Sequence, residues 1–321
     1  MSGYLEGIEG DFPLHHEVVS VLPTGTKAIS AESWGRSAGA KTARIATQLP
    51  SGQERCVQLG SHVPDFGPKP VGKGDYHDEM GNYTHFYVME YHDMDHQSPP
   101  ESAVLAKSVA ELHTKAVSPN GIWAAKFTYL LQDLIRLDNT VNEAWPEYDD
   151  ACKQLIDHVI SRLLGALQSY GRNIEPVLCH GDLWEGNVAT DFETGKIVIF
   201  DPGESMYAHN EIEFGTWRCI WATHFTSPEY ASAYQRLIPP SEPVEDWDDR
   251  NRLYAIKCAI CDSAGHVGSK SRIIAFNDML YLCEKYAPPL ESLEKYDPDK
   301  DISVTGKREV YDVMAGARRS L

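Results

Sequence analysis

The sequence predicts an α+β protein with a small β-rich N-terminal lobe and a large helical C-terminal lobe. Three observations predict this fold class. Residues 1–91 contain short runs of β-branched and aromatic residues, separated by segments rich in Gly and Pro. Residues 92–290 mostly show apolar side chains at helical spacing. Within this helical part, residues 176–201 return to a strand-like composition.

The N-terminal part contains four predicted strands, because each run suits the pleated, half-buried surface of a sheet. These strands lie at residues 28–33, 42–49, 55–59 and 84–91. The connection at 34–41 is rich in turn-forming residues, and the Pro- and Gly-rich stretch at 61–83 predicts a loop.

The C-terminal part contains amphipathic helices and two short strands. One helix opens at residues 98–101, and its apolar face ends at Leu112. Further helices are predicted at 127–137, at 149–170 with Gly171 as the stop, and in the region up to about residue 286. The short strands are expected at 176–180 and 196–200, and a possible helix at 307–319.

These elements divide the chain into three parts. Residues 1–91 form a reduced N-terminal lobe with a hinge near residues 89–92. Residues 92–290 form the helical C-terminal lobe, and residues 291–321 form a charged tail.

The charge of the chain limits its partners. Lys and Arg total 29 against 47 Asp and Glu, which gives a net charge of -18. This charge argues against nucleic-acid binding by phosphate neutralisation and against docking on an anionic membrane. It does not exclude a small anionic ligand such as a nucleotide, because a bound metal ion can supply positive charge.

The N-terminus and the cysteines predict a cytoplasmic protein. The first residues have no basic stretch followed by an apolar one, so we expect no signal peptide. No run approaches the roughly eighteen apolar residues of a membrane span. The seven cysteines are scattered and odd in number, as is typical of free thiols in a reducing compartment. The oligomeric state is left open.

The most informative stretch runs from His180 to Asp201. Asp182 and Asn187 lie in a loop after one predicted strand, and Asp201 ends the next. Because the second strand would pair back beside the loop, we expect three oxygen-bearing side chains to converge at one edge. Phosphoryl transfer requires such a set, with one carboxylate for the acceptor hydroxyl and an amide and a carboxylate for Mg²⁺. His180, Asp182 and Asn187 also keep the His-x-Asp-x-x-x-x-Asn spacing of the protein-kinase catalytic loop.

Each of these residues also has a structural interpretation. The spacing alone occurs by chance in roughly a few per cent of chains of this length. Asp201 could cap a turn after a buried strand, and Asp182 could stabilise a hairpin. The loop, its flanking strands and the aromatic strand earlier in the chain together favour a phosphotransferase.

Three neighbouring motifs are more specific than the spacing. They read His180-Gly181-Asp182-Leu183-Trp184-x-Gly186-Asn187, Phe200-Asp201-Pro202 and Tyr207-Ala208-His209-Asn210-Glu211-x-Glu213-Phe214-Gly215. Together they resemble the fructosamine/ketosamine-3-kinase family, in particular its fungal-type branch. This family is related to the aminoglycoside and choline phosphotransferases and has a protein-kinase-like fold. Weaker similarity, including Thr42-Ala43-Arg44-Ile45, extends over roughly residues 15–287.

The resemblance implies roles for the matching residues. Asp182 would be the catalytic base, and His180 would brace the loop. Asn187 and Asp201 would hold Mg²⁺. Trp184 would form an apolar wall for the substrate or pack in the core.

The resemblance also implies ATP as the phosphate donor. The backbone of Glu90 and Tyr91 would form the hinge that binds adenine. The loop at 33–41 would cover the phosphates, although Gly35 and Gly39 do not form a GxGxxG pattern. Further along the chain, His209 and Glu211, with Glu213, would shape the acceptor pocket or order the segment after Asp201.

The N-terminal lobe departs from the family. Kinase-like enzymes pair a strand lysine with a glutamate of the next helix, and the lysine holds the phosphates. Here Gln58 stands at the lysine position, and only residues 60–62 precede the Val63-Pro64-Asp65-Phe66 segment. A helix of three turns needs about eleven residues, so it does not fit. Lys41 could instead reach a phosphate from the neighbouring loop. A second segment, after Gly121, is also shorter in this chain than in the family.

Two functions therefore remain open. The first is an ATP-dependent kinase that phosphorylates a hydroxyl of a ketosamine, the sugar adduct of an amine or a protein lysine. The second is a catalytically impaired pseudokinase, or a binding or regulatory protein with the same fold. The intact Asp182, Asn187 and Asp201 favour the first, and Gln58 favours the second.

Overall fold

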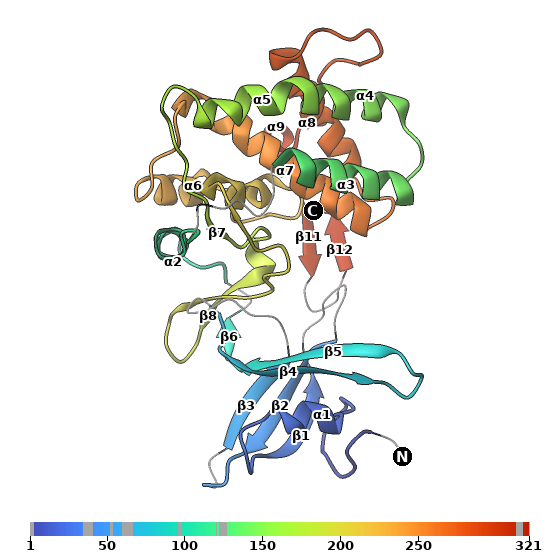
Figure 1. Cartoon of the computed structure of the whole chain (residues 1–321), viewed down its shortest axis with the longest axis vertical. Coiled ribbons are helices and arrows are strands. Elements are labelled where there is room, and N and C mark those ends of the chain that lie inside the picture. The colour runs from blue at the N-terminus through green and yellow to red at the C-terminus, as the bar shows by residue number, and fades with distance from the viewer. Residues whose placement is uncertain are drawn as a thin grey trace. The chain divides into compact units, whose positions relative to one another are not determined.

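The computed structural model describes residues 3–34, 41–51, 54–59, 67–95, 98–119, 121, 127–312 and 317–320. They form two compact units. The first comprises Met1–Pro100, Gly186–Gly203 and Tyr311–Arg319, and the second comprises Glu101–Glu185, Glu204–Val310 and Ser320–Leu321. The first unit is mainly antiparallel sheet and the second is mainly helical, which confirms the predicted α+β class (Figure 1).

The first unit is built on a five-stranded antiparallel sheet with the order β1-β2-β3-β5-β4. Its strands are β1 (Lys27–Ser33), β2 (Ala43–Gln48), β3 (Glu54–Leu59), β4 (Pro70–His77) and β5 (Tyr83–Glu90). Four of these strands match the predicted ones within a few residues. The β1–β2 pair has Ala31 opposite Ile45 and contains an irregularity between Ala28 and Ser30.

The prediction of a loop at residues 61–83 is wrong over β4. This strand pairs with β5 along most of its length, with Gly74 opposite Phe86. The glycines that suggested a loop are needed for packing. A Cβ at Gly72 would lie 2.5 Å from the Val21 side chain, and one at Gly74 would lie 2.7 Å from the Phe86 ring. Single-sequence turn signals do not distinguish a loop from a strand approached this closely.

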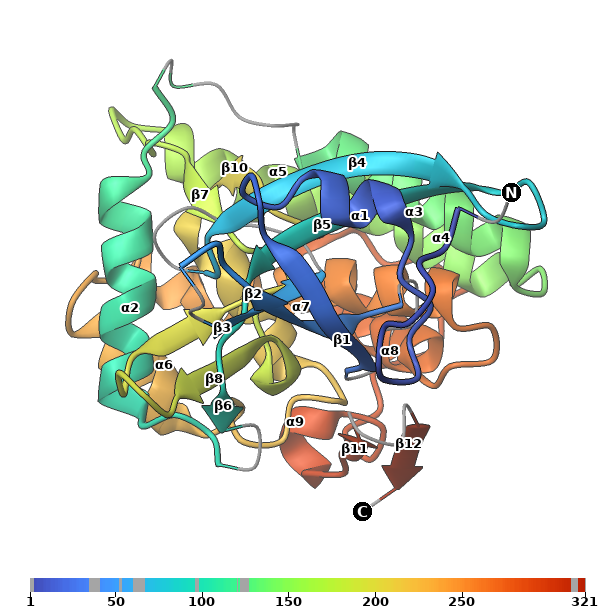
Figure 2. The same ribbon diagram turned by 90° about the horizontal axis from the view of Figure 1, so that it is seen from below.

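One face of this sheet is covered by the N-terminal segment with helix α1 (His16–Ser20), which lies over β4 in Figure 2. The core between them contains Leu14, Val18, Ile45 and Val88. On β2, buried and half-buried residues alternate, so this strand has one core face and one outward face.

A second sheet of the first unit has the order β6-β8-β9. Its strands are β6 (Met94–Asp95), β8 (Val188–Asp191) and β9 (Ile197–Ile199). The β8–β9 hairpin lies in the middle of the helical part of the sequence, but its contacts place it in the first unit. Strand β9 was predicted from its apolar run, whereas β8 was not.

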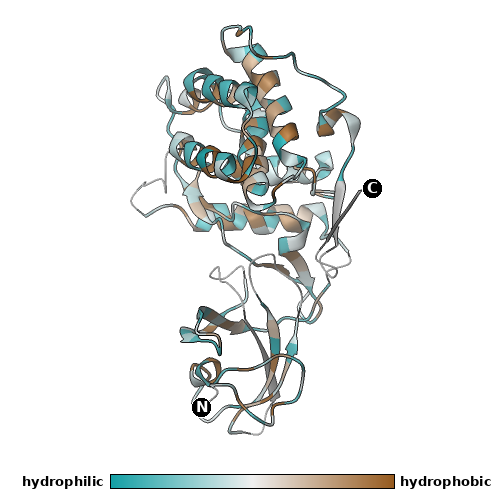
Figure 3. Cartoon of the chain, turned by 90° about the vertical axis from the view of Figure 1, so that its right-hand side faces the viewer, coloured by the Kyte–Doolittle hydropathy of each residue, from teal (hydrophilic) through white to brown (hydrophobic). Residues whose placement is uncertain are grey.

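The second unit contains most of the helices, which carry mixed apolar and polar residues in Figure 3. Its main helices are α2 (Ser102–Lys115), α3 (Phe127–Val141), α4 (Pro146–Gln154), α6 (Pro228–Gln235), α7 (Trp247–Gly265) and α8 (Ser271–Tyr286). One hydrophobic core lies among α3, α4 with the segment that follows it, α7 and α8, and it includes Leu131, Leu155, Ile256 and Phe276. The helix predicted at 149–170 is divided into several helical segments. It begins within α4 and continues as a π-helical segment (Leu155–Val159), α5 (Ile160–Leu163) and a 3₁₀ turn (Gly165–Gln168).

The remaining β elements are short. Strand β7 (Val177–Cys179) pairs with β10 (Met206–Ala208), and β7 was predicted while β10 was not. The helix predicted at 307–319 is wrong, because β11 (Glu309–Asp312) and β12 (Ala317–Ser320) pair as strands there. The spacing of apolar residues along the chain does not report pairing with a neighbouring strand. This pairing determines the secondary structure of the segment.

Candidate active site

The predicted catalytic loop begins where β7 ends. Cys179, the last residue of β7, is opposite Met206 of β10. Gly181 follows with a φ of 83°, in the left-handed region that favours glycine. A Cβ at this position would lie 2.3 Å from the Glu204 carbonyl oxygen. The Gly of His-Gly-Asp is therefore required both by the turn and by the close approach of the next chain segment.

Glu213 holds the start of this loop. Its carboxylate accepts the backbone N–H of His180 at 2.7 Å and that of Gly181 at 3.0 Å. Glu213 lies in η4 (Asn210–Arg218), a 3₁₀ segment, and is fully buried. A carboxylate that accepts two successive backbone N–H groups fixes the direction in which the loop leaves the strand.

Two more side chains of η4 hold the other side of the loop. The Leu183 carbonyl accepts the Thr216 hydroxyl at 3.0 Å and the Trp217 indole N–H at 2.8 Å. Within the loop, the Nδ1 atom of His180 accepts the backbone N–H of Asp182 at 3.3 Å. His180 is buried, whereas Asp182 is half-buried. The loop backbone is thus anchored on both sides of Asp182, which fits the bracing role predicted for His180.

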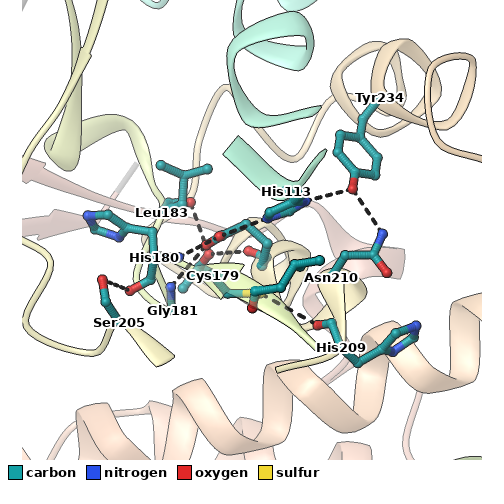
Figure 4. Close-up of polar contacts among 12 residues, drawn as sticks. His113, Cys179, His180, Gly181, Leu183, Ser205, His209, Asn210 and Tyr234 are labelled. Carbon is teal, nitrogen blue, oxygen red and sulfur yellow. Dashed lines mark hydrogen bonds and ion pairs between the residues drawn. The ribbon is translucent and has the colours of Figure 1, made fainter. Parts of the chain in front are cut away.

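A buried hydrogen-bond chain supports Glu213. His113 of α2 lies 3.5 Å from the Glu213 carboxylate through Nε2, and its Nδ1 is 2.7 Å from the Tyr234 hydroxyl. The Asn210 amide donates to the same hydroxyl at 2.9 Å. Figure 4 shows Asn210 and His113 meeting at the Tyr234 hydroxyl. Burial opposes ionisation of Glu213, but His113 and the His180 contacts outweigh it and hold the pKa of Glu213 below its ordinary value. Glu213 therefore remains a carboxylate, the form that accepts both N–H groups.

His113, Cys179 and Glu213 also have metal-ligand atoms within 4.8 Å of one another. Their surroundings do not favour a metal ion. Burial raises the pKa of Cys179 well above its usual value, and a thiol must lose its proton to bind a metal. Glu213 already accepts two backbone N–H groups. We interpret this cluster as part of the support of the loop.

Glu185 anchors the far end of the loop. Its Oε1 atom accepts the backbone N–H groups of Thr223, at 2.7 Å, and Phe225, at 2.9 Å, and also that of His224. Sequence reasoning did not identify this residue. A carboxylate next to a motif is too common a signal without knowledge of the segment that folds onto it.

Asn187 and Asp201 lie at the open end of the β8–β9 hairpin. The Phe200 N–H donates to the Asn187 carbonyl at 3.0 Å, and Val188 is opposite Ile199. Asn187 is buried and Asp201 is exposed, with a φ of 60°. A non-glycine residue in the left-handed region is uncommon, and such strain concentrates at functional positions. Both residues carry the oxygen ligands that Mg²⁺ prefers, so they fit the ion chemically.

The hinge expected at Glu90 and Tyr91 lies in the same unit as this hairpin. The Glu90 N–H donates to the Lys69 carbonyl at 2.8 Å, so this group belongs to the sheet. Adenine would then use other backbone groups of residues 90–92. Within this segment, His92 Nδ1 lies 2.7 Å from the Asp191 carboxylate, a contact that connects the expected hinge to β8. Sequence reasoning missed this contact, because the two residues are distant in the chain.

Hydrogen bonds between Trp34 and Thr42 join the two ends of the loop expected to cover the phosphates. The Trp34 N–H donates to the Thr42 carbonyl at 2.9 Å, and the Thr42 hydroxyl contacts the Trp34 carbonyl. Gly35 and Gly39 lie outside the described residues. Gln58 lies within β3, and ten residues separate the end of β3 from β4.

The three predicted substrate residues lie in the second unit. Trp184 is half-buried and packs against a cluster that includes Cys219 and Trp221. His209 is buried, with its ring nitrogens 2.8 Å from the Tyr254 hydroxyl and 2.9 Å from the Ser241 hydroxyl. These contacts fit an ordering role for His209, and contact with a substrate stays a prediction.

Glu211 is likewise buried in the second unit. Its carboxylate accepts the Arg250 Nε–H at 2.7 Å and the Ser241 backbone N–H at 2.7 Å. A buried carboxylate that pairs with a buried arginine neutralises both charges in the interior. Glu211 thus connects η4 to α7, and its predicted contact with the substrate also stays a prediction.

The two-lobed fold, the His-Gly-Asp loop and the hairpin after it define a protein-kinase-like phosphotransferase fold. Spectinomycin phosphotransferase in its AMP-bound complex has this fold, with a TM-score of 0.50 and 13% identity over 83% of this chain and 94% of that one. Residues 61–262, well over half of the chain, match the family model for fructosamine kinase. The chain therefore belongs to the fructosamine kinase family.

The relatives with a named activity match only part of the chain. It is 28% identical over 194 residues to the chloroplastic protein-ribulosamine 3-kinase of Oryza sativa subsp. indica, a match that covers 53% of this chain and 52% of that protein. The ketosamine-3-kinase of Mus musculus is 40% identical over 117 residues, 35% of each chain. The chain thus spans about half the length of its rice relative. Among the helices that the structure describes, none is long and apolar enough to cross a membrane.

Proposed function

We propose that this protein transfers the γ-phosphoryl group of ATP to a hydroxyl of a ketosamine. The observation that carries the proposal is the anchoring of the His180–Leu183 backbone by Glu213, Thr216 and Trp217, which holds Asp182 in a fixed loop. The family match and the rice and mouse relatives supply the acceptor class.

Each residue then has one task. Asp182 orients the acceptor hydroxyl and takes its proton as the oxygen–phosphorus bond forms, while ADP leaves. Asn187 and Asp201 would hold Mg²⁺. When bound, the ion neutralises charge on the transferring phosphoryl group. The backbone of residues 90–92 binds adenine, and Trp184 faces the sugar.

The direct test is an assay of the purified full chain with Mg-ATP and fructosamine or ribulosamine acceptors. We expect phosphorylated ketosamine from the wild-type protein. The Asp182→Asn variant should lose about 10²–10⁴-fold in turnover, because an amide does not accept the hydroxyl proton. It should keep the melting temperature of the wild type. A variant with wild-type turnover would exclude Asp182 as the base.

A second candidate function is that of a pseudokinase. One observation favours it: Gln58 stands at the lysine position, and only ten residues connect β3 to β4. A helix of three turns with a partner glutamate takes about eleven. A pseudokinase would give no turnover with any ketosamine. Thermal stabilisation by ATP with and without Mg²⁺ separates a nucleotide-binding pseudokinase from a chain with no nucleotide site.

A further inference from the structure

The outward face of the first unit's sheet carries a positively charged side chain. On β2, Ala43, Ile45 and Thr47 are buried, whereas Arg44 is half-buried. Ile45 belongs to the core formed with the N-terminal segment. Because successive side chains of a strand point to opposite faces, Arg44 leaves the sheet on the face away from this core.

Two aromatic rings hold the guanidinium of Arg44. Its Cζ atom lies 4.8 Å from the centre of the Tyr91 ring and 5.7 Å from that of Trp34. The two rings are themselves in edge contact, with their centres 5.7 Å apart. Cation–π contacts of this kind attract the cation and restrict the motion of a long side chain. Arg44 is therefore held in place before any ligand binds.

The two rings come from the segments in which a nucleotide is expected. Trp34 is the last described residue before the 33–41 loop continues, and it pairs with Thr42 where the loop returns. Tyr91 follows the end of β5, at the expected hinge. The cation thus lies between the hinge and the base of the loop expected to cover the phosphates.

Strand register places Arg44 beside the position of the absent lysine. In the β2–β3 ladder, Arg44 is directly opposite Gln58. Directly opposite positions of an antiparallel pair share one face of the sheet, with Cβ atoms about 4.5–5.5 Å apart. A cation at position 44 can therefore serve the region that a lysine at position 58 would serve.

We propose that Arg44 binds the phosphate groups of the nucleotide in this protein, in place of the lysine absent at position 58. The proposal rests on the proposed phosphotransfer function. A guanidinium has five N–H donors in one plane and binds phosphate through two parallel hydrogen bonds. Lys41 is exposed, whereas Arg44 is already positioned by its aromatic neighbours.

The test measures nucleotide binding to the full-length protein by calorimetry, with Mg-ATP and with adenosine as probes. We expect Arg44→Met to weaken Mg-ATP binding by about ten- to a hundredfold, the effect of one charge-assisted contact. Adenosine binding should change less than about threefold, because adenosine has no phosphate. The matched control is Lys27→Met, which removes an exposed positive charge from β1 and should leave both affinities unchanged.

A second variant protects the test against a folding defect. In Arg44→Met/Gln58→Lys, the cation returns on the opposite strand, and most of the lost Mg-ATP affinity should return with it. Equal loss of adenosine and Mg-ATP binding in Arg44→Met, without recovery in the double variant, would show a structural role and overturn the proposal. Loss of Mg-ATP affinity confined to Lys41→Met would assign the role to Lys41.

The outcomes also separate this proposal from the proposed function. Unchanged Mg-ATP affinity in Arg44→Met, with turnover intact in the wild type, would overturn the role of Arg44 alone. A wild-type protein that binds neither probe at millimolar concentration would overturn both. Tight Mg-ATP binding that depends on Arg44, without turnover on any ketosamine, would support Arg44 and favour the pseudokinase.

Discussion

The buried carboxylate of Glu213 accepts the backbone N–H of His180 at 2.7 Å, although Glu213 lies 33 positions later in the chain. This contact and the one to Gly181 connect η4 to the loop that carries Asp182. His113 supports the carboxylate from α2. The position of the proposed catalytic base therefore depends on a side chain that makes no contribution to the chemistry itself.

We expect Glu213→Gln to lower the free energy of unfolding by about 2–3 kcal/mol, because a neutral amide accepts hydrogen bonds less strongly and faces one N–H group with a donor. Turnover should fall by a larger factor than KM rises, because the substitution displaces the loop that carries Asp182 but leaves the Asp182 side chain unchanged. Urea unfolding and steady-state kinetics measure these effects. The matched control is Glu229→Gln, an exposed acid of α6, which should change stability by no more than about 0.5 kcal/mol. Unchanged stability and turnover in Glu213→Gln would show that the loop needs no such anchor.

Gly181→Ala should destabilise the protein strongly. The φ of 83° costs an alanine about 1–3 kcal/mol, and its Cβ would lie 2.3 Å from the Glu204 carbonyl oxygen, so the backbone must also shift. Thermal or urea unfolding gives the magnitude. Gly165→Ala is the control, because a Cβ there meets nothing within 4 Å and the residue lies in a helical turn. This control should be neutral or slightly stabilising. Equal effects of the two substitutions would contradict the conformational argument.

Asp201→Asn should raise the Mg²⁺ concentration needed for half-maximal turnover by more than about tenfold. Substitution of a residue that only supports a metal ligand already lowers metal affinity by about 10–100-fold. Asp201→Asn removes the charge of a proposed ligand itself. Asparagine tolerates the left-handed backbone that Asp201 adopts, so the fold should be retained. Titration of turnover with Mg²⁺ at fixed ATP measures the shift. Glu193→Gln, an exposed change in the same hairpin, should leave the Mg²⁺ requirement unchanged. An equal requirement in Asp201→Asn and wild type would exclude Asp201 as a ligand.

His209 should make the fold less stable in weak acid. Burial lowers its pKa from an ordinary value of 6.5 to about 4, so the folded protein keeps the ring neutral. Between these values the unfolded chain binds a proton that the folded chain does not, and stability falls as pH falls. Between pH 7 and 5 the wild type should therefore lose about 2 kcal/mol more than His209→Gln. Urea unfolding at the two pH values measures the difference. Parallel losses in both proteins would show that His209 takes up its proton in the folded state at its ordinary pKa.

Much of the first unit follows from local sequence. Strands β1, β2 and β5 alternate or concentrate β-branched and aromatic residues, and this period of two is a local property. Strand β4 was missed, because Gly72 and Gly74 are turn-forming residues unless another segment packs against them. The same limit explains β11 and β12, in which strand pairing prevailed over a helical spacing pattern.

The sequence by itself determined which residues carry the proposed chemistry. Asp182, Asn187 and Asp201 were predicted from spacing and residue type, because phosphoryl transfer needs a carboxylate for the acceptor hydroxyl and oxygen ligands for Mg²⁺. Only the tertiary structure decided how the loop is held, through Glu213 and His113, and which cation lies near the hinge, through the register that sets Arg44 opposite Gln58. The physical reason is separation in the chain. A hydrogen bond between residues 33 positions apart, or a contact between strands, depends on packing that no local pattern encodes.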